Sequence, residues 1–470
     1  MGTVPQFEAR AQTLESSTLR KIRTRILPYL FLLYIVAFLD RINIGFAALT
    51  MNRELGITAA QFGLISGIFF WGYFLFEIPS NVLMHKIGGR IWIARILVTW
   101  GVVAVLTGFV RNTSQLYVAR FLLGVAEAGF FPGIILYLTY WFRQRDLAQA
   151  LALFIAAAPV SGFIGAPVSV FILDHVHWVG ISGWRWLLVL EGLPAILCGV
   201  ITYFLLPSRP AEASFLSGVE KGWLTKELAR EEEAKVTERA ASALSVFSHR
   251  QVWHLALTWF TYQIGVYAMY FWMPQMVKSV AKSYSNSAVG AVVMIPYLAG
   301  VIAMVLMSRS SDRRSERKYH GAACLLVAGI GLVLLGRMTT PWQAVMLWSI
   351  IAMGISSFNG PFWAIPNQFL AGVAGASGIA LINSVGNLGG FVGPATLGWI
   401  GQKTGNLYAG LAFQAVTKLS LGFHNRLMGR CPRDERGHFH LPTFKVKRAG
   451  SIRCFRPRWT NSFPSTISAG

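Results

Sequence analysis

Apolar runs of about 20 residues repeat along most of this 470-residue chain. A helix rises 1.5 Å per residue, so a run of this length crosses the roughly 30 Å hydrocarbon core of a bilayer. We predict eleven such helices, from the runs at 26–50, 61–84, 91–110, 115–141, 146–172, 184–206, 252–277, 288–307, 319–338, 342–366 and 376–401. A twelfth run begins at Leu407, contains Lys418 and loses its apolar character after Phe423. The pattern predicts an all-α polytopic membrane protein whose twelfth helix is truncated or altered.

The composition excludes several soluble classes. Hydrophobic residues make up 54% of the chain and charged residues only 13%, whereas an average soluble domain carries roughly 25% charged residues. Too few charges remain to cover a surface that faces water, so a soluble enzyme, a disordered chain and a disulfide scaffold are excluded. The net charge of +22 would indicate nucleic-acid binding in a soluble protein. In a membrane protein, lysine and arginine instead collect in cytoplasmic loops.

The basic residues alternate between loops in the way that sets membrane orientation. One set of alternate loops holds 20 lysines and arginines, and the opposite set holds 6. The richer set includes the segment Arg20–Arg25 and the loop at 207–251. Because basic loops stay in the cytoplasm, we predict a multi-pass membrane protein with a cytoplasmic amino terminus.

One long loop, from residue 207 to 251, divides the predicted helices into two sets. It carries seven basic and seven acidic residues, and such mixed charge is typical of a solvated amphipathic helix rather than a nucleic-acid patch. We therefore predict an N-terminal six-helix half at 1–206, a charged cytoplasmic linker at 207–251 and a C-terminal helical half at 252–417. Two such halves are typical of secondary transporters, whose substrate site lies between them.

The segment 418–470 departs from the rest of the chain in composition. It holds eleven basic and two acidic residues, and thus +9 of the net charge. Two interpretations stay open: a basic arm that touches anionic lipid or a partner, or an atypical, frameshifted end that replaced the second half of the last helix. The second is favoured because the change falls inside an apolar run.

Two loops carry related motifs. Between runs 288–307 and 319–338 stands Ser308-x-x-x-Asp312-Arg313-Arg314-x-x-Arg317-Lys318, and between runs 61–84 and 91–110 stands Asn81-x-x-x-His85-Lys86-x-Gly88-Gly89-Arg90. Both resemble the GxxxDRxGRR loop of the major facilitator superfamily, in which acidic and basic residues gate the cytoplasmic side through helix-end charges. His85 stands where that family has aspartate. The resemblance implies gating roles for His85, Lys86, Arg90, Asp312 and Arg313.

Four longer motifs resemble those of one branch of that superfamily, the anion:cation symporter family. They are Leu39-Asp40-Arg41-Ile42-Asn43, Glu77-Ile78-Pro79-Ser80-Asn81, the stretch RFLLGVAEAGFFPG at 120–133, and Gly386-Asn387-Leu388-Gly389-Gly390. The resemblance runs from about residue 20 to 416 and is greatest to bacterial tartrate transporters. It implies a major-facilitator fold of two pseudo-symmetric halves. It also implies a proton-coupled symporter of the cell inner membrane that imports an organic anion, such as tartrate, by alternating access.

Two alternatives stay open within transport. An aromatic acid or a sugar acid would fit as substrate as well as tartrate. The rival function is an efflux pump of the same superfamily for amphipathic drugs, which would not need paired arginines and acids on its substrate side.

Charged residues inside the apolar runs are the candidate functional residues. A charge near the bilayer midplane costs at least about 2.5–3.5 kcal/mol, so a retained one generally faces a pathway or a partner. Asp40 and Arg41 lie in the middle of the first run, and Arg120 and Glu127 share one face of the fourth. We predict that Asp40 and Glu127 couple protons and neutralise the two arginines. Protonation would free an arginine, and Arg120 would then bind a substrate carboxylate with both arms of its guanidinium.

The same charges admit structural interpretations. Asp40 with Arg41, and Arg120 with Glu127, can each be an ion pair that braces its helix. Glu77 and Glu191 stand close to prolines, where carboxylates often satisfy freed backbone groups or cap neighbouring helices, so we interpret both as structural.

The C-terminal runs offer only neutral polar and aromatic groups away from their loops. We predict that these groups bind the organic part of the substrate, while Arg41 and Arg120 are the substrate-binding residues of the N-terminal half. The candidates are Tyr262, Gln263, Asn359, Asn383 and Asn387.

No cofactor, metal or catalytic site is predicted. The four cysteines lack metal-like CxxC spacing, and no GxxxxGK[ST] phosphate loop occurs. A membrane enzyme would also need an interfacial cluster of histidine or acidic residues, which the sequence lacks. The expected partners are protons, a small organic anion and the lipid bilayer, and the expected state is a monomer.

Overall fold

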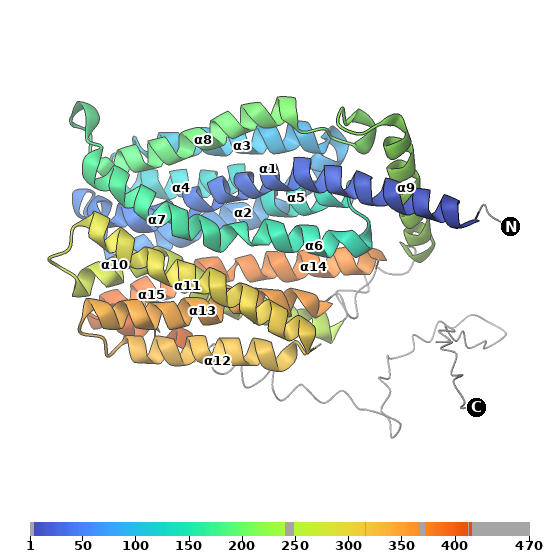
Figure 1. Cartoon of the computed structure of the whole chain (residues 1–470). Coiled ribbons are helices and arrows are strands. Elements are labelled where there is room, and N and C mark those ends of the chain that lie inside the picture. Colours follow the sequence, from blue (N-terminus) through green and yellow to red (C-terminus); the bar gives the residue numbers. More distant parts are fainter. Residues whose placement is uncertain (1–3, 240–248, 315, 367–371, 412, 416–470) are drawn as a thin grey trace, which may run out of the picture. The chain divides into compact units, whose positions relative to one another are not determined.

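The computed structural model describes residues 4–239, 249–314, 316–366, 372–411 and 413–415, and in these residues it contains helices and no strand (Figure 1). Before the linker the helices are α1 (Val4–Glu54), α2 (Ala59–Ile87), α3 (Gly89–Thr107), α4 (Thr113–Glu127), α5 (Phe130–Thr139), α6 (Gln144–Ile155), α7 (Ala157–His175) and α8 (Gly183–Leu205). After α9 (Gly218–Arg239) follow α10 (Arg250–Val280), α11 (Asn286–Arg313), α12 (Lys318–Leu335), α13 (Pro341–Ala364), α14 (Gly372–Asn387) and α15 (Gly389–Thr404). The 3-10 turns η1 (Trp178–Gly180) and η2 (Pro210–Glu212) lie in loops of the described chain.

All eleven predicted runs lie on these helices, and eight helices of the described chain are long and apolar enough to cross a membrane. Large apolar side chains on their outer surfaces, such as Ile78 and Phe204, are exposed. In water such a surface would be unfavourable, whereas in a bilayer it faces lipid.

Three of the predicted continuous runs are interrupted. The run at 115–141 divides into α4 and α5, that at 146–172 into α6 and α7, and that at 376–401 into α14 and α15. Between α4 and α5, Gly129 adopts a φ of +83°, and Ser80 of α2 occupies the space that a β-carbon would need. Glycine alone adopts this conformation without strain, so the interruption follows from Gly129.

Most helix contacts fall into two groups. In the first, α3 packs on α4 and α8, α2 on α4, and α1 on α7 and α8; in the second, α13 packs on α11 and α12, and α10 on α14 and α15. The groups meet where α2 contacts α15, α7 contacts α11 and α1 contacts α10. This pattern agrees with the division at 207–251, which stays a prediction.

One contact between the groups lies at the end of the helices opposite α9. Asp174 of α7 accepts hydrogen bonds from the Asn286 side chain (2.7 Å) and from the backbone N–H and hydroxyl of Ser287 (2.7 and 2.8 Å), at the start of α11. Its carboxylate therefore satisfies one of the free backbone N–H groups at the start of that helix.

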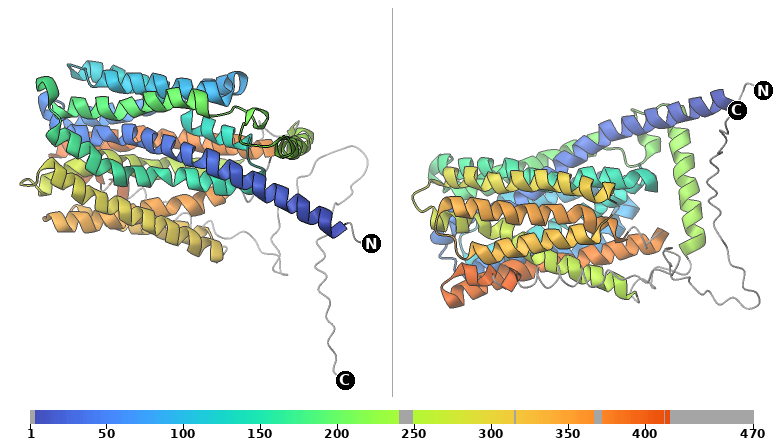
Figure 2. Two further views of the ribbon diagram at one scale, coloured as in Figure 1. Left: turned by 45° about the horizontal axis from the view of Figure 1, so that its top comes forward. Right: turned by 60° about the horizontal axis from the view of Figure 1, so that its bottom comes forward.

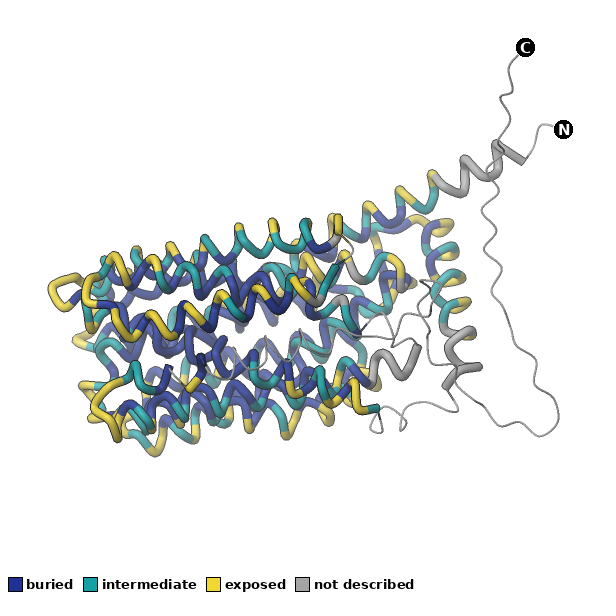
Figure 3. The backbone as a smooth tube through the Cα atoms, turned by 90° about the horizontal axis from the view of Figure 1, so that it is seen from below, coloured by how far each residue is buried: buried dark blue, intermediate teal, exposed yellow. Residues whose placement is uncertain are grey.

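The linker helix α9 lies across the ends of the other helices, and the first turns of α1 project beyond the same end (Figure 2). Buried positions run along the middle of the helices, while exposed positions gather in the loops at the opposite end (Figure 3). The last apolar run is helical at 407–411 and 413–415. Its predicted truncation and the segment 418–470 lie outside the described residues.

Candidate functional site

Four charged side chains are buried in the middle of the first helix group. Asp40 and Arg41 come from α1, and Arg120 and Glu127 from α4, and all four residues are at most 6% exposed. Glu127 is the last residue of α4, directly before the interruption at Gly129. Interrupted helices near the midplane frequently form the ion and substrate sites of transporters.

Arg41 connects the two helix groups. Its Nη2 donates to Glu127 Oε1 in a buried ion pair, and its Nη1 donates to the Tyr267 hydroxyl of α10 at 3.2 Å. The rings of Phe69 and Tyr73, both from α2, lie 5.3 and 5.6 Å from the Arg41 guanidinium carbon. Aromatic faces at this distance stabilise a cation.

Asp40 makes its hydrogen bonds away from Arg41. Trp100 of α3 donates its indole N–H to Asp40 Oδ2 at 2.7 Å, and Asn43 donates to Oδ1 at 3.4 Å. Arg41 therefore pairs with the acid on α4 rather than with its neighbour in sequence.

Arg120 lacks the partner that we predicted. Its Nε and Nη2 atoms are buried and have no hydrogen-bond partner among the described residues, and the Phe69 ring lies 5.4 Å from its guanidinium carbon. One turn on, a β-carbon at Gly124 would collide with the Phe69 carbonyl, so glycine lets α2 and α4 approach closely. The close approach holds Phe69 against both arginines.

The candidates of the second helix group form two separate contacts. Asn359 donates to the Tyr262 hydroxyl at 2.9 Å, and Tyr262 donates to the Ile355 carbonyl at 2.8 Å. Asn383 donates to Glu77 of α2 at 3.1 Å. The remaining candidates, Gln263 and Asn387, are buried.

Glu77 and Glu191, both interpreted as structural, bind different partners. Glu191 accepts a hydrogen bond from Ser169 at 2.6 Å, within the first helix group. Glu77 instead accepts from two side chains of α14, Asn383 and Ser384, and so connects the groups.

The predicted gating residues lie around the α9 end. His85 is within hydrogen-bonding distance of the Tyr140 hydroxyl (3.1 Å), and the Arg90 guanidinium lies 5.9 Å from the Tyr203 ring. Lys86 and Arg313 are exposed, and the side chain of Asp312 lies outside the described part of the chain.

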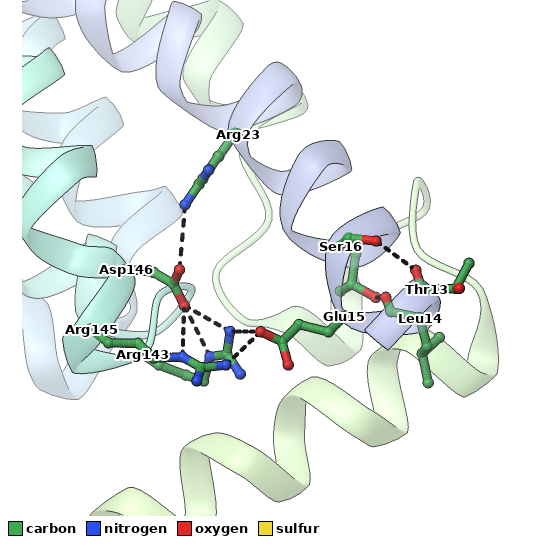
Figure 4. Close-up of polar contacts among 9 residues, drawn as sticks. Thr13, Leu14, Glu15, Ser16, Arg23, Arg143, Arg145 and Asp146 are labelled. Carbon is green, nitrogen blue, oxygen red and sulfur yellow. Dashed lines mark hydrogen bonds and ion pairs between the residues drawn. The ribbon is translucent and has the colours of Figure 1, made fainter. Parts of the chain in front are cut away.

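A second ionic cluster braces the α9 end (Figure 4). Arg143 pairs with Glu15 at 2.8 Å and with Asp146 at 2.9 Å. Arg145 adds a second bond to Glu15 (2.5 Å), and Arg23 a second to Asp146 (3.3 Å). This cluster ties the projecting part of α1 to the start of α6.

Sequence reasoning missed several members of the central site. Trp100, Phe69 and Tyr73 were not candidates because aromatic residues in apolar runs are more often lipid-facing or core residues. A usable signal was the spacing of Phe69, Tyr73 and Glu77 on α2, because positions four apart share a helix face.

A family model described as Major Facilitator Superfamily matches residues 30–394. The chain belongs to this superfamily. A protein of Agrobacterium vitis named Putative tartrate transporter is 46% identical over 402 residues, which are 86% of this chain and 89% of that protein. The Quinolone resistance transporter of Acinetobacter baumannii is 36% identical, over 86% of this chain and 93% of that protein. The solved xylose transporter XylE from E. coli matches with a TM-score of 0.70 at 13% identity, over 87% of this chain and 99% of that structure.

These similarities confirm the predicted superfamily and the all-α fold class of the transporter. It is a multi-pass membrane protein that carries a solute rather than an enzyme. The eight apolar helices and the exposed apolar side chains fit this conclusion.

Proposed function

We propose that the transporter is a proton-coupled symporter that imports a small organic carboxylate, such as tartrate, by alternating access. The observation that carries the proposal is the unequal pairing of the two buried arginines. Arg41 is paired with Glu127, whereas Arg120 leaves two nitrogens without a hydrogen-bond partner among the described residues. An unpaired buried cation is unfavourable, and a carboxylate satisfies a guanidinium with two parallel hydrogen bonds. The similarity to a protein named Putative tartrate transporter supports a carboxylate substrate.

Coupling follows from the ion pair between Arg41 and Glu127. A proton on Glu127 removes its charge and leaves Arg41 as a second uncompensated cation next to Arg120. Binding of an anionic substrate then restores neutrality. Binding of the anion therefore favours binding of the proton, and binding of the proton favours binding of the anion. Asp40, held by Trp100 and Asn43, is the second proposed proton carrier.

The neutral side chains of the second helix group are proposed to bind the rest of the substrate. They are Tyr262, Gln263, Asn359, Asn383 and Asn387, and Arg41 reaches the same group through Tyr267.

The halves 1–206 and 252–417 are proposed to rock about this site, in a monomer. The excess of basic residues in the loops at the α9 end supports a cytoplasmic location for the amino terminus and the linker. The membrane that the protein spans is proposed to be the cell inner membrane. His85, Lys86, Arg90, Asp312 and Arg313 are proposed to gate that side. At the opposite end, the bonds from Asn286 and Ser287 to Asp174 hold the halves together.

Uptake into proteoliposomes tests the proposal. The purified transporter is reconstituted, an inward proton gradient is imposed, and uptake of labelled tartrate, gluconate and phthalate is measured with and without a protonophore. We expect uptake of at least one carboxylate above its equilibrium level, abolished by the protonophore. Uptake that an inward proton gradient does not stimulate would refute proton symport. Stimulation by a sodium gradient alone would mean that sodium, rather than the proton, is the coupling ion.

Drug efflux is the second candidate, because the Quinolone resistance transporter is 36% identical over most of both chains. The same proteoliposomes decide between the two with labelled norfloxacin. Norfloxacin transport in the direction opposite to proton flow, with no carboxylate uptake, would favour efflux.

A further inference from the structure

Glu77 is a buried acid whose contacts cross from one helix group to the other. It lies in the second half of α2 and is 3% exposed. Its Oε1 accepts a hydrogen bond from the Asn383 amide at 3.1 Å, and its Oε2 accepts one from the Ser384 hydroxyl at 3.0 Å. Both donors belong to α14. Each carboxylate oxygen therefore has one donor from the opposite group.

The sequence of α2 sets Glu77 next to the arginine site. Phe69, Tyr73 and Glu77 follow at intervals of four residues and share one face of the helix. The first two carry the rings that lie against Arg41. Glu77 is one turn beyond Tyr73, about 6 Å along the helix axis.

The second helix group offers this position a carboxylate-binding pair and, in its described part, no buried acid. Asn383 and Ser384 present an amide N–H and a hydroxyl, which hydrogen-bond a carboxylate whether it belongs to a side chain or to a small molecule. Buried polar side chains in the described part of α10 to α15 are all neutral: Thr258, Gln263, Ser311, Ser356, Ser357, Asn383 and Asn387. The negative charge that these donors bind comes from the first group.

We propose that Glu77 is a tethered stand-in for a substrate carboxylate. In the empty transporter it occupies Asn383 and Ser384, and a dicarboxylate displaces it when one carboxylate binds at the arginine site, where Arg41 lies against Phe69 and Tyr73, and the other binds these two donors. A monocarboxylate binds at the arginine site alone and leaves Glu77 in place. Glu77 thus sets the preference between one and two carboxylates, an inference that rests on the proposed function.

The variant Glu77→Gln tests the competition, because it keeps the side-chain size and removes the charge. Hydrogen bonds to a charged group are roughly twice as strong as neutral ones, so the glutamine competes less well for Asn383 and Ser384. We expect the Kd of tartrate, measured by titration calorimetry on the full chain in detergent, to fall about tenfold. The Kd of glycerate, which has one carboxylate, is expected to stay within about twofold of wild type.

Two further variants separate this role from a structural one. Glu191→Gln neutralises an equally buried acid that bonds only within the first group, and it should leave both Kd values unchanged. Replacing Asn383 and Ser384 together with alanine should weaken tartrate binding about tenfold and remove the gain from Glu77→Gln. Elution as a single monodisperse species in size-exclusion chromatography controls for folding of each variant.

The outcomes distinguish this proposal from the one on which it rests. Wild-type binding of tartrate with no gain in Glu77→Gln, or an equal gain for glycerate, overturns the role of Glu77 and leaves the proposed function intact. If the wild type binds neither tartrate nor phthalate nor gluconate, the proposed function is wrong and the role of Glu77 falls with it.

Discussion

The two ionic clusters of the transporter differ in how completely their cations are paired. At the α9 end, Arg143 lies between Glu15 and Asp146, and its side chain is 4% exposed. In the centre, Arg120 is 1% exposed and has two nitrogens with no hydrogen-bond partner in the described chain. Burial is nearly equal, so the number of acidic partners is what distinguishes the two arginines. Arg143, with two acidic partners, holds helices together, whereas we propose that Arg120 is stabilised by a ligand that brings negative charge.

Glu127→Gln breaks the central cluster and has the largest expected effect. Without an ionisable group at position 127, Arg41 remains uncompensated at every pH, so protonation no longer frees it. Asp40 bonds Trp100 and Asn43 rather than Arg41, so it cannot replace this step. We expect proton-driven accumulation of the substrate to fall to the level of protein-free liposomes, while exchange between labelled and unlabelled substrate stays measurable.

The end cluster provides the matched control. Asp146→Asn also removes a carboxylate that pairs with an arginine, but away from the centre, and it should retain accumulation. Full accumulation by Glu127→Gln, or its loss in Asp146→Asn, would contradict the distinction between the clusters.

Arginine-to-lysine substitution sharpens the comparison, because it keeps the charge and removes the planar fork. In Arg120→Lys we expect the KM for the carboxylate to rise about tenfold, since one of two parallel hydrogen bonds is lost. In Arg143→Lys we expect an unchanged KM and a loss of about 1–3 kcal/mol in the free energy of unfolding. Uptake kinetics and thermal unfolding of both variants check these two expectations. A raised KM in Arg143→Lys alone would mean that Arg143, rather than Arg120, binds the carboxylate.

Sequence reasoning located the helices and the central charges because both depend on composition along the chain. An apolar run predicts a helix whatever it packs against, and a charge such as Arg120 within a run stands out at once. The partners of these charges could not be predicted. Arg41 pairs with Glu127, 86 residues away, rather than with adjacent Asp40, because the rotation of each helix decides which side chains meet.

Two further features depend on contacts that no local pattern encodes. The bond between Glu77 and Asn383 joins residues 306 positions apart. The interruption after Glu127 lies at Gly129, whose left-handed backbone lies against Ser80 of α2. Neither feature could be predicted from the sequence of one helix considered alone, because each depends on a contact between two helices.

The smallest expected effect concerns a single ion pair, between the partly exposed Lys21 side chain of α1 and the buried carboxylate of Glu220 on α9 (2.8 Å). Burial raises the pKa of Glu220, but hydrogen bonds from Lys21 and Ser217 outweigh this and lower the pKa from 4.5 to about 2. The charged carboxylate thus favours the docked helix. Its contribution is complete above about pH 4.5 and is lost as the pH falls toward 2, because the undocked form takes up a proton first. The Lys21 side chain is 42% exposed, so the contribution is below about 1 kcal/mol.

Hydrogen exchange of the α9 amides, normalised to an unstructured peptide at each pH, should show protection that declines between about pH 4.5 and 2 in the wild type. In Glu220→Gln the decline should be absent, and an equal decline in both proteins would mean that another group titrates.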